Sequence, residues 1–227
     1  MRVIVAAGGT GGHIYPALAI IDKIKKENKD SEILYIGTTD RMEKDIVPKR
    51  GIDFLGIEIK GLNRRNPFSN ISVMKKFLQA IKKAKKIIKD FQPDIVIGVG
   101  GYITAPVLYA AHRLGVKTLI HEQNSIPGLS NKFLASFVDT VCVSLPGSIS
   151  YFPKKKTVYT GNPRSEEILT IEKVSKTKYG FLPNKKLVLI VMGSLGSTTM
   201  TKKLKEVIRG FADKDYQVLM VTGKAYY

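Results

Sequence analysis

The chain has 227 residues, of which 44% are hydrophobic, and a formal net charge of +18. This composition supports a buried core and excludes wholesale disorder, and the length predicts one complete domain and part of another, since domains cluster at about 100 to 150 residues. The excess of 37 Lys and Arg over 19 Asp and Glu favours an anionic partner, which leaves nucleic acid, anionic lipid and phosphorylated substrates as candidates.

Short apolar strands alternate with helical patterns through the first 160 residues. Strands are predicted at Arg2–Ala7, Glu32–Ile36, Phe54–Ile59, Asp94–Val99, Lys117–His121, Thr140–Val143 and Thr157–Thr160. Helices are predicted at Tyr15–Asn28, Arg41–Lys49, Ile71–Asp90, Ala105–Leu114 and Leu129–Ser136. This alternation predicts an α/β fold, a Rossmann-like doubly wound parallel sheet with its site at the carboxyl ends of the strands.

The first strand runs into a glycine turn, Gly8–His13, with the sequence GGTGGH. A strand that turns through glycines into a helix directs bare N–H groups and the positive end of the helix dipole at one place. We expect the amides of this turn, Gly8 to Gly12, to hold a phosphate, with His13 as a titratable group beside it; a merely tight turn is the alternative. A nicotinamide cofactor is a minor alternative, because Gly37–Thr39 stands where a dinucleotide fold needs an acidic residue.

Two more polar clusters follow predicted strands. Gly100, Gly101 and Tyr102 follow one strand, and the sequence HEQN, His121–Asn124, follows the next. Because the carboxyl ends of parallel strands share one edge of a sheet, we expect both clusters to join the first glycine turn in one site. For Glu122, partnership with a neighbouring Lys or backbone amide is as good an interpretation as catalysis.

The predicted helix at Ile71–Asp90 is amphipathic and strongly basic. Its lysines are either a solvated surface over a core-facing stripe or a contact with an anionic membrane surface, to which Pro67 and Phe68 would add an apolar foot. In the second interpretation the Lys75–Lys89 segment faces the lipid. No nucleic acid partner is expected, because no groove-reading motif occurs.

The only cysteine, Cys142, stands in an apolar strand pattern, so no internal disulfide can form and a reducing compartment is expected. No apolar run reaches the roughly 18 to 20 residues of a membrane span, and the N-terminus has no signal-peptide pattern. We therefore expect a cytoplasmic protein.

Residues 1–163 are predicted to form the first domain, 164–185 a linker, and 186–227 the start of a second, incomplete Rossmann-like domain. The second domain is expected to have strands at Leu187–Val191 and Gln217–Thr222, with a helix at Met200–Phe211 between them. Two strands and one helix cannot cover both faces of a sheet, so this part is marginal by itself.

The motifs together resemble the MurG family. They are Gly8–Ala17, Gly100–Tyr102, His121–Asn124 with Pro127–Gly128 and Asn131–Lys132, and Gly161–Arg164. The resemblance covers the whole chain in order and implies a peptidoglycan glycosyltransferase of the B type. Such an enzyme adds N-acetylglucosamine from UDP-N-acetylglucosamine to undecaprenyl-diphosphate-linked muramyl-pentapeptide, peripherally, at the cytoplasmic face of the membrane.

The resemblance also implies roles for single residues. The acceptor diphosphate is expected at the two glycine turns and the leaving UDP at Gly193–Ser194, without metal or cofactor. Arg164 is similar to a uridine-contacting position, and Thr10, Asn124 and Asn131 to positions that bind sugar or phosphate. His13 is the expected base, because the helix dipole disfavours the imidazolium, with Glu122 as the second catalytic candidate. For His13, a helix-capping or acceptor-binding role is the alternative.

One departure from the family falls in the second-domain turn, Met192–Ser197, which lacks the family's leading pair of glycines and its final Gly-Ala. This crowds the expected phosphate approach. Because most of the donor domain is absent from the sequence, an inactive acceptor-binding and membrane-docking module, or half of a split enzyme, is the alternative to an active transferase.

Overall fold

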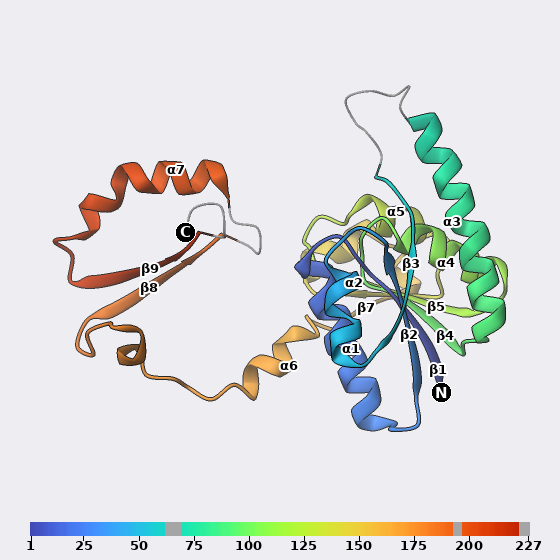
Figure 1. The fold of residues 1–227 in the computed structure, drawn as a ribbon, viewed down its shortest axis with the longest axis horizontal. Helices are drawn as coiled ribbons and strands as arrows, with labels where there is room; N and C mark the ends of the chain where they lie inside the picture. Colours follow the sequence, from blue (N-terminus) through green and yellow to red (C-terminus); the bar gives the residue numbers. More distant parts are fainter. Residues whose placement is uncertain (62–69, 193–196, 223–227) are drawn as a thin grey trace. The chain divides into compact units, whose positions relative to one another are not determined.

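The computed structural model describes residues 1–61, 70–192 and 197–222. It divides into two compact units, Met1–Leu169 and Thr170–Tyr227, which are described separately (Figure 1). The first unit extends through helix α6 (Arg164–Leu169), a segment that the sequence assigns to the linker.

The first unit is built on a parallel sheet whose described strands have the order β3-β2-β1-β4-β5-β6-β7. The strands are β1 (Arg2–Ala6), β2 (Glu32–Thr38), β3 (Asp53–Ile57), β4 (Ile95–Gly98), β5 (Lys117–Glu122), β6 (Thr140–Val143) and β7 (Thr157–Tyr159). In the register, Val3 lies beside Ile33 on one side and Ile95 on the other. The predicted doubly wound parallel sheet is therefore confirmed.

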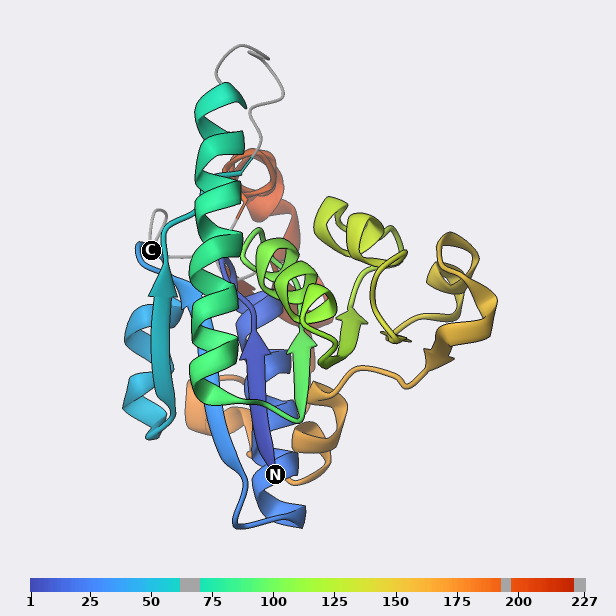
Figure 2. The same cartoon turned by 90° about the vertical axis from the view of Figure 1, so that its right-hand side faces the viewer.

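Helices cover both faces of this sheet (Figure 2). They are α1 (Gly11–Glu27), α2 (Glu43–Ile46), α3 (Asn70–Phe91), α4 (Thr104–Arg113) and α5 (Leu129–Leu134), with 3-10 turns at Pro48–Arg50, Pro146–Tyr151 and Lys154–Lys156. Val3 and Val5 pack in a buried cluster with α1, whereas Ile4 and Ala6 pack in a second cluster with α3 and α4. Because successive strand residues point to opposite faces, β1 is apolar throughout.

Two predicted helices differ from the observed ones. Helix α1 begins at Gly11 rather than Tyr15, with Thr10 as its N-cap, so the second pair of glycines forms the first helical turn. The helix predicted over Arg41–Lys49 is divided into α2 and a 3-10 turn that starts at Pro48, because proline has no N–H to continue the helical hydrogen bonds.

The strand order places a topological switch point between β1 and β4. The chain leaves β1 for β2 and β3 on one side and then returns to β4 on the other. Helices therefore diverge to opposite faces between these two strands, and a crevice opens at their carboxyl ends. The turns Gly8–His13 and Gly100–Tyr102 both follow strands at this point.

Helix α3 has a buried face and an exposed face. Ala80, Ala84 and Ile88 are buried in a cluster with the sheet and α4, and Val73 on the same face is also buried. Ile71, Met74 and Leu78 lie on the other side and are 76%, 54% and 60% exposed. The helical repeat places Lys75, Lys82, Lys85 and Lys89 on the same side as these three residues. Among the described residues no helix is long and apolar enough to cross a membrane.

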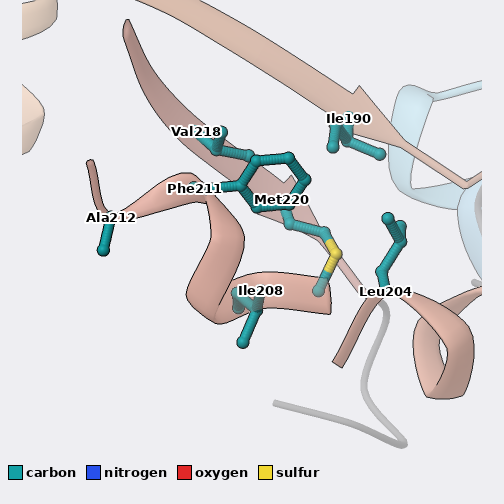
Figure 3. A pocket seen from close by; sticks show the side chains of 7 residues that line it. All are labelled: Ile190, Leu204, Ile208, Phe211, Ala212, Val218 and Met220. Carbon is teal, nitrogen blue, oxygen red and sulfur yellow. The ribbon is translucent and has the colours of Figure 1, made fainter. Parts of the chain in front are cut away.

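The second unit contains one β-α-β element. Strands β8 (Lys186–Val191) and β9 (Tyr216–Val221) are parallel, and α7 (Thr198–Val207) and a 3-10 turn (Ile208–Phe211) connect them. Another 3-10 turn, Lys176–Tyr179, precedes the sheet. Figure 3 shows the apolar side chains that line a cavity of about 250 Å³ between this helical segment and the sheet: Ile190, Leu204, Ile208, Phe211, Ala212, Val218 and Met220.

The alternate residues of β8 and β9 are exposed, among them Leu189 at 59% and Val191 at 58%. Within the described residues, one helical segment covers one face of this sheet, and the other face is apolar and exposed.

Candidate functional site

The two glycine turns of the first unit touch. The Gly8 N–H donates to the Gly100 carbonyl oxygen at 3.2 Å. Gly101 has φ +93 and lies so close that a Cβ there would overlap the Gly8 carbonyl group. Only residues without a side chain allow two backbones to approach in this way. The structure therefore confirms the prediction that these two turns lie together at one edge of the sheet.

His13 lies between the turns. Its Nδ1 is 3.1 Å from the Gly8 carbonyl oxygen, and a Cβ on Gly100, whose φ is +104, would collide with the imidazole ring. A carbonyl oxygen only accepts hydrogen bonds, so Nδ1 carries a proton and, in the neutral ring, Nε2 carries the lone pair. Nε2 is on the side of Gly100. The residue is half-buried.

The first glycine turn has fewer available amides than its sequence suggests. Gly8 N–H is bound to Gly100, and Gly9 N–H donates to Glu43 Oε2 at 3.1 Å. The part that remains is the first turn of α1, with Gly11 and Gly12, since the first N–H groups of a helix have no partner inside it. Thr10 at the N-cap is exposed and its side chain makes no cap hydrogen bond.

Tyr102 is 57% exposed beside this turn. Its ring packs against Gly61, where a Cβ would overlap it. Of the glycine turn in which a phosphate is predicted, only Thr10, Gly11 and Gly12 remain as candidate phosphate-binding residues. Gly100 and Gly101 lie beside them, with His13 packed against Gly100.

Glu43, at the start of α2, contacts the first glycine turn and is a candidate site residue that sequence reasoning missed. Its side chain has no exposed surface, and its Oε1 accepts hydrogen bonds from Thr38 N–H at 3.0 Å and Thr38 O–H at 2.7 Å. Burial, and secondarily the charge of Glu43, raise the pKa of the buried Tyr35 phenol. A lone Glu in a polar helix start carries no signal of burial, which is why the sequence did not identify it.

Glu122 is buried and completely hydrogen-bonded. Oε1 accepts from Asn124 N–H at 2.9 Å and Asn124 Nδ2 at 2.8 Å, and Oε2 accepts from Gly128 N–H and Asn131 Nδ2, both at 3.0 Å. Four donors occupy both oxygens, so none is left to take a proton from a substrate. The geometry thus favours the alternative of an amide partner over the expected catalytic role: Glu122 holds the loop after β5.

The two asparagines differ in access. Asn124 is exposed, although its amide nitrogen is bound to Glu122. Asn131 is only 3% exposed and donates to the His121 carbonyl at 3.3 Å and to Glu122. Its burial favours a structural role through Glu122 over the expected contact with sugar or phosphate.

His121 joins β5 to the segment after β7. Its Nε2 donates to the Gly161 carbonyl at 3.1 Å, while Gln123 Nε2 donates to its Nδ1 at 2.9 Å. The ring must be neutral for Nδ1 to accept. Burial lowers the pKa of His121, since the hydrogen bond to Gly161 and the charge of Glu122 only partly oppose the loss of solvation.

Arg164 lies at the start of α6, against α1. Its guanidinium is 5.2 Å from the centre of the Tyr15 ring, and Nη1 pairs with Glu167 Oε2 at 2.6 Å. Ser194 and Gly193, the expected donor-phosphate residues, lie outside the described residues, as do Pro67 and Phe68. No group of three His, Cys, Asp or Glu side chains suited to a metal ion occurs in the described part of the chain.

Residues 3–143 match the glycosyltransferase family 28 N-terminal domain. The chain belongs to this family. The match covers β1 to β6 and therefore all three strand ends that carry the site.

Curated relatives extend the match to the whole chain. It is 47% identical over 228 residues to a Bacillus licheniformis protein named UDP-N-acetylglucosamine--N-acetylmuramyl-(pentapeptide) pyrophosphoryl-undecaprenol N-acetylglucosamine transferase. A Bacillus cereus protein of the same name, numbered 1, is also 47% identical. All of this chain is covered, but it spans only 62% and 63% of the length of these two relatives.

Among solved structures, the crystal structure of Acinetobacter baumannii MurG matches with a TM-score of 0.71 at 24% identity, over 97% of this chain and 67% of that one. This likeness confirms the glycosyltransferase B fold, and together with the relatives it confirms the resemblance to the MurG family.

Replacing Glu122 tests its role in holding the loop. Glu122→Gln substitutes an N–H₂ group for an oxygen that accepts two hydrogen bonds, so the free energy of unfolding of the first unit should fall by about 2 to 5 kcal/mol. Urea denaturation followed by circular dichroism measures it. The control, Glu27→Gln, changes a 68% exposed carboxylate and should cost less than about 0.5 kcal/mol. Equal effects of the two variants would contradict the assignment.

His121 should make stability depend on pH. Its folded pKa is lowered from 6.5, so below that pH the unfolded chain takes up a proton that the folded chain does not. Stability is therefore full above pH 6.5 and falls as the pH decreases toward 5. Thermal unfolding across this range should show the decrease, with a shallower slope in His121→Gln. The control His112→Gln removes an exposed imidazole and should keep the wild-type slope; identical slopes in all three proteins would refute the prediction.

Proposed function

We propose that this chain contributes the acceptor-binding part of a hexosyltransferase. The reaction is transfer of N-acetylglucosamine from UDP-N-acetylglucosamine to the C4 hydroxyl of undecaprenyl-diphosphate-linked N-acetylmuramyl-pentapeptide, in peptidoglycan synthesis. The names of the relatives support this reaction. The observation that carries the proposal is the position of His13 between two touching glycine turns, beside the N-terminus of α1.

The acceptor diphosphate suits the start of α1. Gly11 and Gly12 offer backbone N–H groups at the positive end of a helix of 17 residues, and Thr10 adds an exposed hydroxyl. Glu43 and Gly100 already occupy the two preceding amides. The anion therefore binds at the helix side of the turn, and the sugar that it carries extends toward His13 and Tyr102.

Transfer with inversion needs one proton acceptor. His13 Nε2 takes the proton of the C4 hydroxyl while that oxygen forms a bond to the anomeric carbon of N-acetylglucosamine. The bond from this carbon to the diphosphate oxygen breaks, and UDP leaves with its electron pair. Arg164 and the turn at Gly193–Ser194 are the positions proposed to hold the donor. Glu122, with Asn124 and Asn131, keeps the loop after β5 in place.

The exposed face of α3 suits an anionic membrane surface, where the lipid acceptor is embedded. Ile71, Met74 and Leu78 are apolar and exposed, and lysines flank them on the same side. The buried face shows that this apolar stripe is not needed for the core, which favours the membrane interpretation over a solvated surface. A peripheral position at the cytoplasmic face of the bacterial cell membrane follows.

A second candidate function is an acceptor-binding and membrane-docking module without transfer activity, or one half of a split enzyme. The observation that favours it is the second unit, in which the described residues form two strands and one helical segment with an uncovered sheet face. Both candidates require the acceptor site, and only transfer separates them.

An assay on this chain distinguishes the two candidates. Binding of a lipid-linked muramyl-pentapeptide acceptor and transfer from labelled UDP-N-acetylglucosamine are measured on the same preparation. His13→Ala should retain acceptor binding and lose transfer by about a hundredfold or more, the usual contribution of a general base. The control His112→Ala, on the far end of α4, should keep both activities.

Turnover by the chain would support the enzyme and exclude the inactive module. Binding without turnover would support the module. Absence of binding, or full turnover in His13→Ala, would overturn the proposed acceptor site or the proposed base respectively.

Vesicle co-sedimentation tests the α3 surface. Binding to vesicles with anionic lipid should weaken at high salt, and Lys75→Gln with Lys82→Gln should reduce affinity by about tenfold, since each lysine near the surface contributes about 1 kcal/mol at most. The matched control, Lys29→Gln with Lys49→Gln, removes the same charge from exposed sites elsewhere. Equal losses in both double variants would show that net charge, and not this helix, drives binding.

A further inference from the structure

The peptide unit between Gly8 and Gly9 connects two functional side chains. Its carbonyl oxygen accepts from His13 Nδ1 at 3.1 Å, and its N–H donates to Glu43 Oε2 at 3.1 Å. A carboxylate and an imidazole thus contact opposite ends of a single amide. Because an amide N–H bound to an anion leaves more negative charge on its carbonyl oxygen, the two hydrogen bonds strengthen each other.

Glu43 occupies a socket shaped for its carboxylate. A Cβ on Gly8 would collide with Oε1, and a Cβ on Gly37 would come within 2.6 Å of Cγ. Thr38 donates both its N–H and its hydroxyl to Oε1. Within the described residues no cationic side chain forms a salt bridge with it, although its exposure is 0%. Burying a charge without a counter-charge is costly, so the socket has a use beyond packing.

We propose that Glu43 is a positioning residue for His13: acting through the Gly8–Gly9 peptide unit, it holds the imidazole in the Nδ1–H tautomer and leaves Nε2 as the proton acceptor. The proposal rests on the proposed function, in which Nε2 takes the proton of the acceptor hydroxyl. It assigns to Glu43, which lies 34 positions from Gly9 in the sequence, the task that a directly bonded carboxylate performs in many histidine-dependent enzymes.

His121 provides an internal reference for this tautomer. Its partners impose the opposite arrangement, with Nε2–H donating to Gly161 and Nδ1 accepting from Gln123. The hydrogen-bond partners therefore place a proton on Nδ1 of His13 and on Nε2 of His121, and these two tautomers of a neutral ring give different nitrogen chemical shifts. His112 is exposed on α4 and serves as the third signal.

Nitrogen-15 NMR of the chain at pH 8 tests the proposal without any activity. His13→Gln and His121→Gln assign the signals. In the wild type, about nine-tenths or more of neutral His13 should be Nδ1–H, and in Glu43→Gln this fraction should fall below about half, since neutral histidine otherwise prefers the Nε2–H form. His121 should remain Nε2–H in both proteins. A wild-type His13 in the Nε2–H form, or an unchanged tautomer in Glu43→Gln, would overturn the proposal.

Thr38→Val is the matched control. It removes the hydroxyl donor from the same socket and keeps the carboxylate, so His13 should stay Nδ1–H; an equal shift in Thr38→Val and Glu43→Gln would mean that general disturbance of the turn is responsible. If Glu43→Gln does not fold, Glu43→Asp decides, since the shorter side chain retracts from Gly9 and should lower the Nδ1–H fraction, and no change would again overturn the proposal.

Failure of the proposal and failure of the proposed function are distinguishable. If the His13 tautomer depends on Glu43 but His13→Ala transfers normally, the positioning role of Glu43 stands and the proposal that His13 is the catalytic base fails. If His13→Ala loses transfer but the His13 tautomer is unchanged in Glu43→Gln, His13 stands as the base and the positioning role of Glu43 fails.

Discussion

Backbone contact between the turn after β1 and the turn after β4 is the constraint from which the site follows. Parallel pairing of these strands brings both turns to one edge, and the absence of a Cβ at Gly101 lets the two backbones touch. This contact also positions His13, because its ring packs against Gly100 and its Nδ1–H donates a hydrogen bond to the Gly8 carbonyl oxygen. A Cβ at Gly100 would collide with the imidazole ring, and a Cβ at Gly8 would collide with the Glu43 carboxylate.

Two buried carboxylates stabilise the loops at this edge in the same way. Glu43 and Glu122 each accept hydrogen bonds from backbone amides and from one or two polar side chains, without a cationic partner in the described residues. Each joins the end of a strand to a segment further along the chain. Because such a cluster is stable only when all its donors and acceptors meet, it imposes one geometry on loops that would otherwise be mobile. Site groups are then held in place before a substrate binds.

Helix α3 shows how one amphipathic pattern serves two surfaces. Its small and branched residues, such as Ala80, Ala84 and Ile88, pack against the sheet and α4. The apolar residues at Ile71, Met74 and Leu78 are additional and exposed among lysines. An apolar stripe beside positive charge is suited to the boundary between water and an anionic bilayer.

Local pattern determined the kinds and order of the elements, the glycine turns and the family, because periodicity and glycine spacing act over a few residues. It predicted that His13 and the glycines of two strand ends share one edge. Tertiary structure alone decided which groups the carboxylates contact. From the sequence, Glu122 is a candidate acid or base, whereas in the structure its carboxylate accepts hydrogen bonds from Gly128 and Asn131. Glu43, which binds the Gly9 amide, has no local sequence signal. The role of a carboxylate depends on the donors that folding brings to it, and those come from distant parts of the chain.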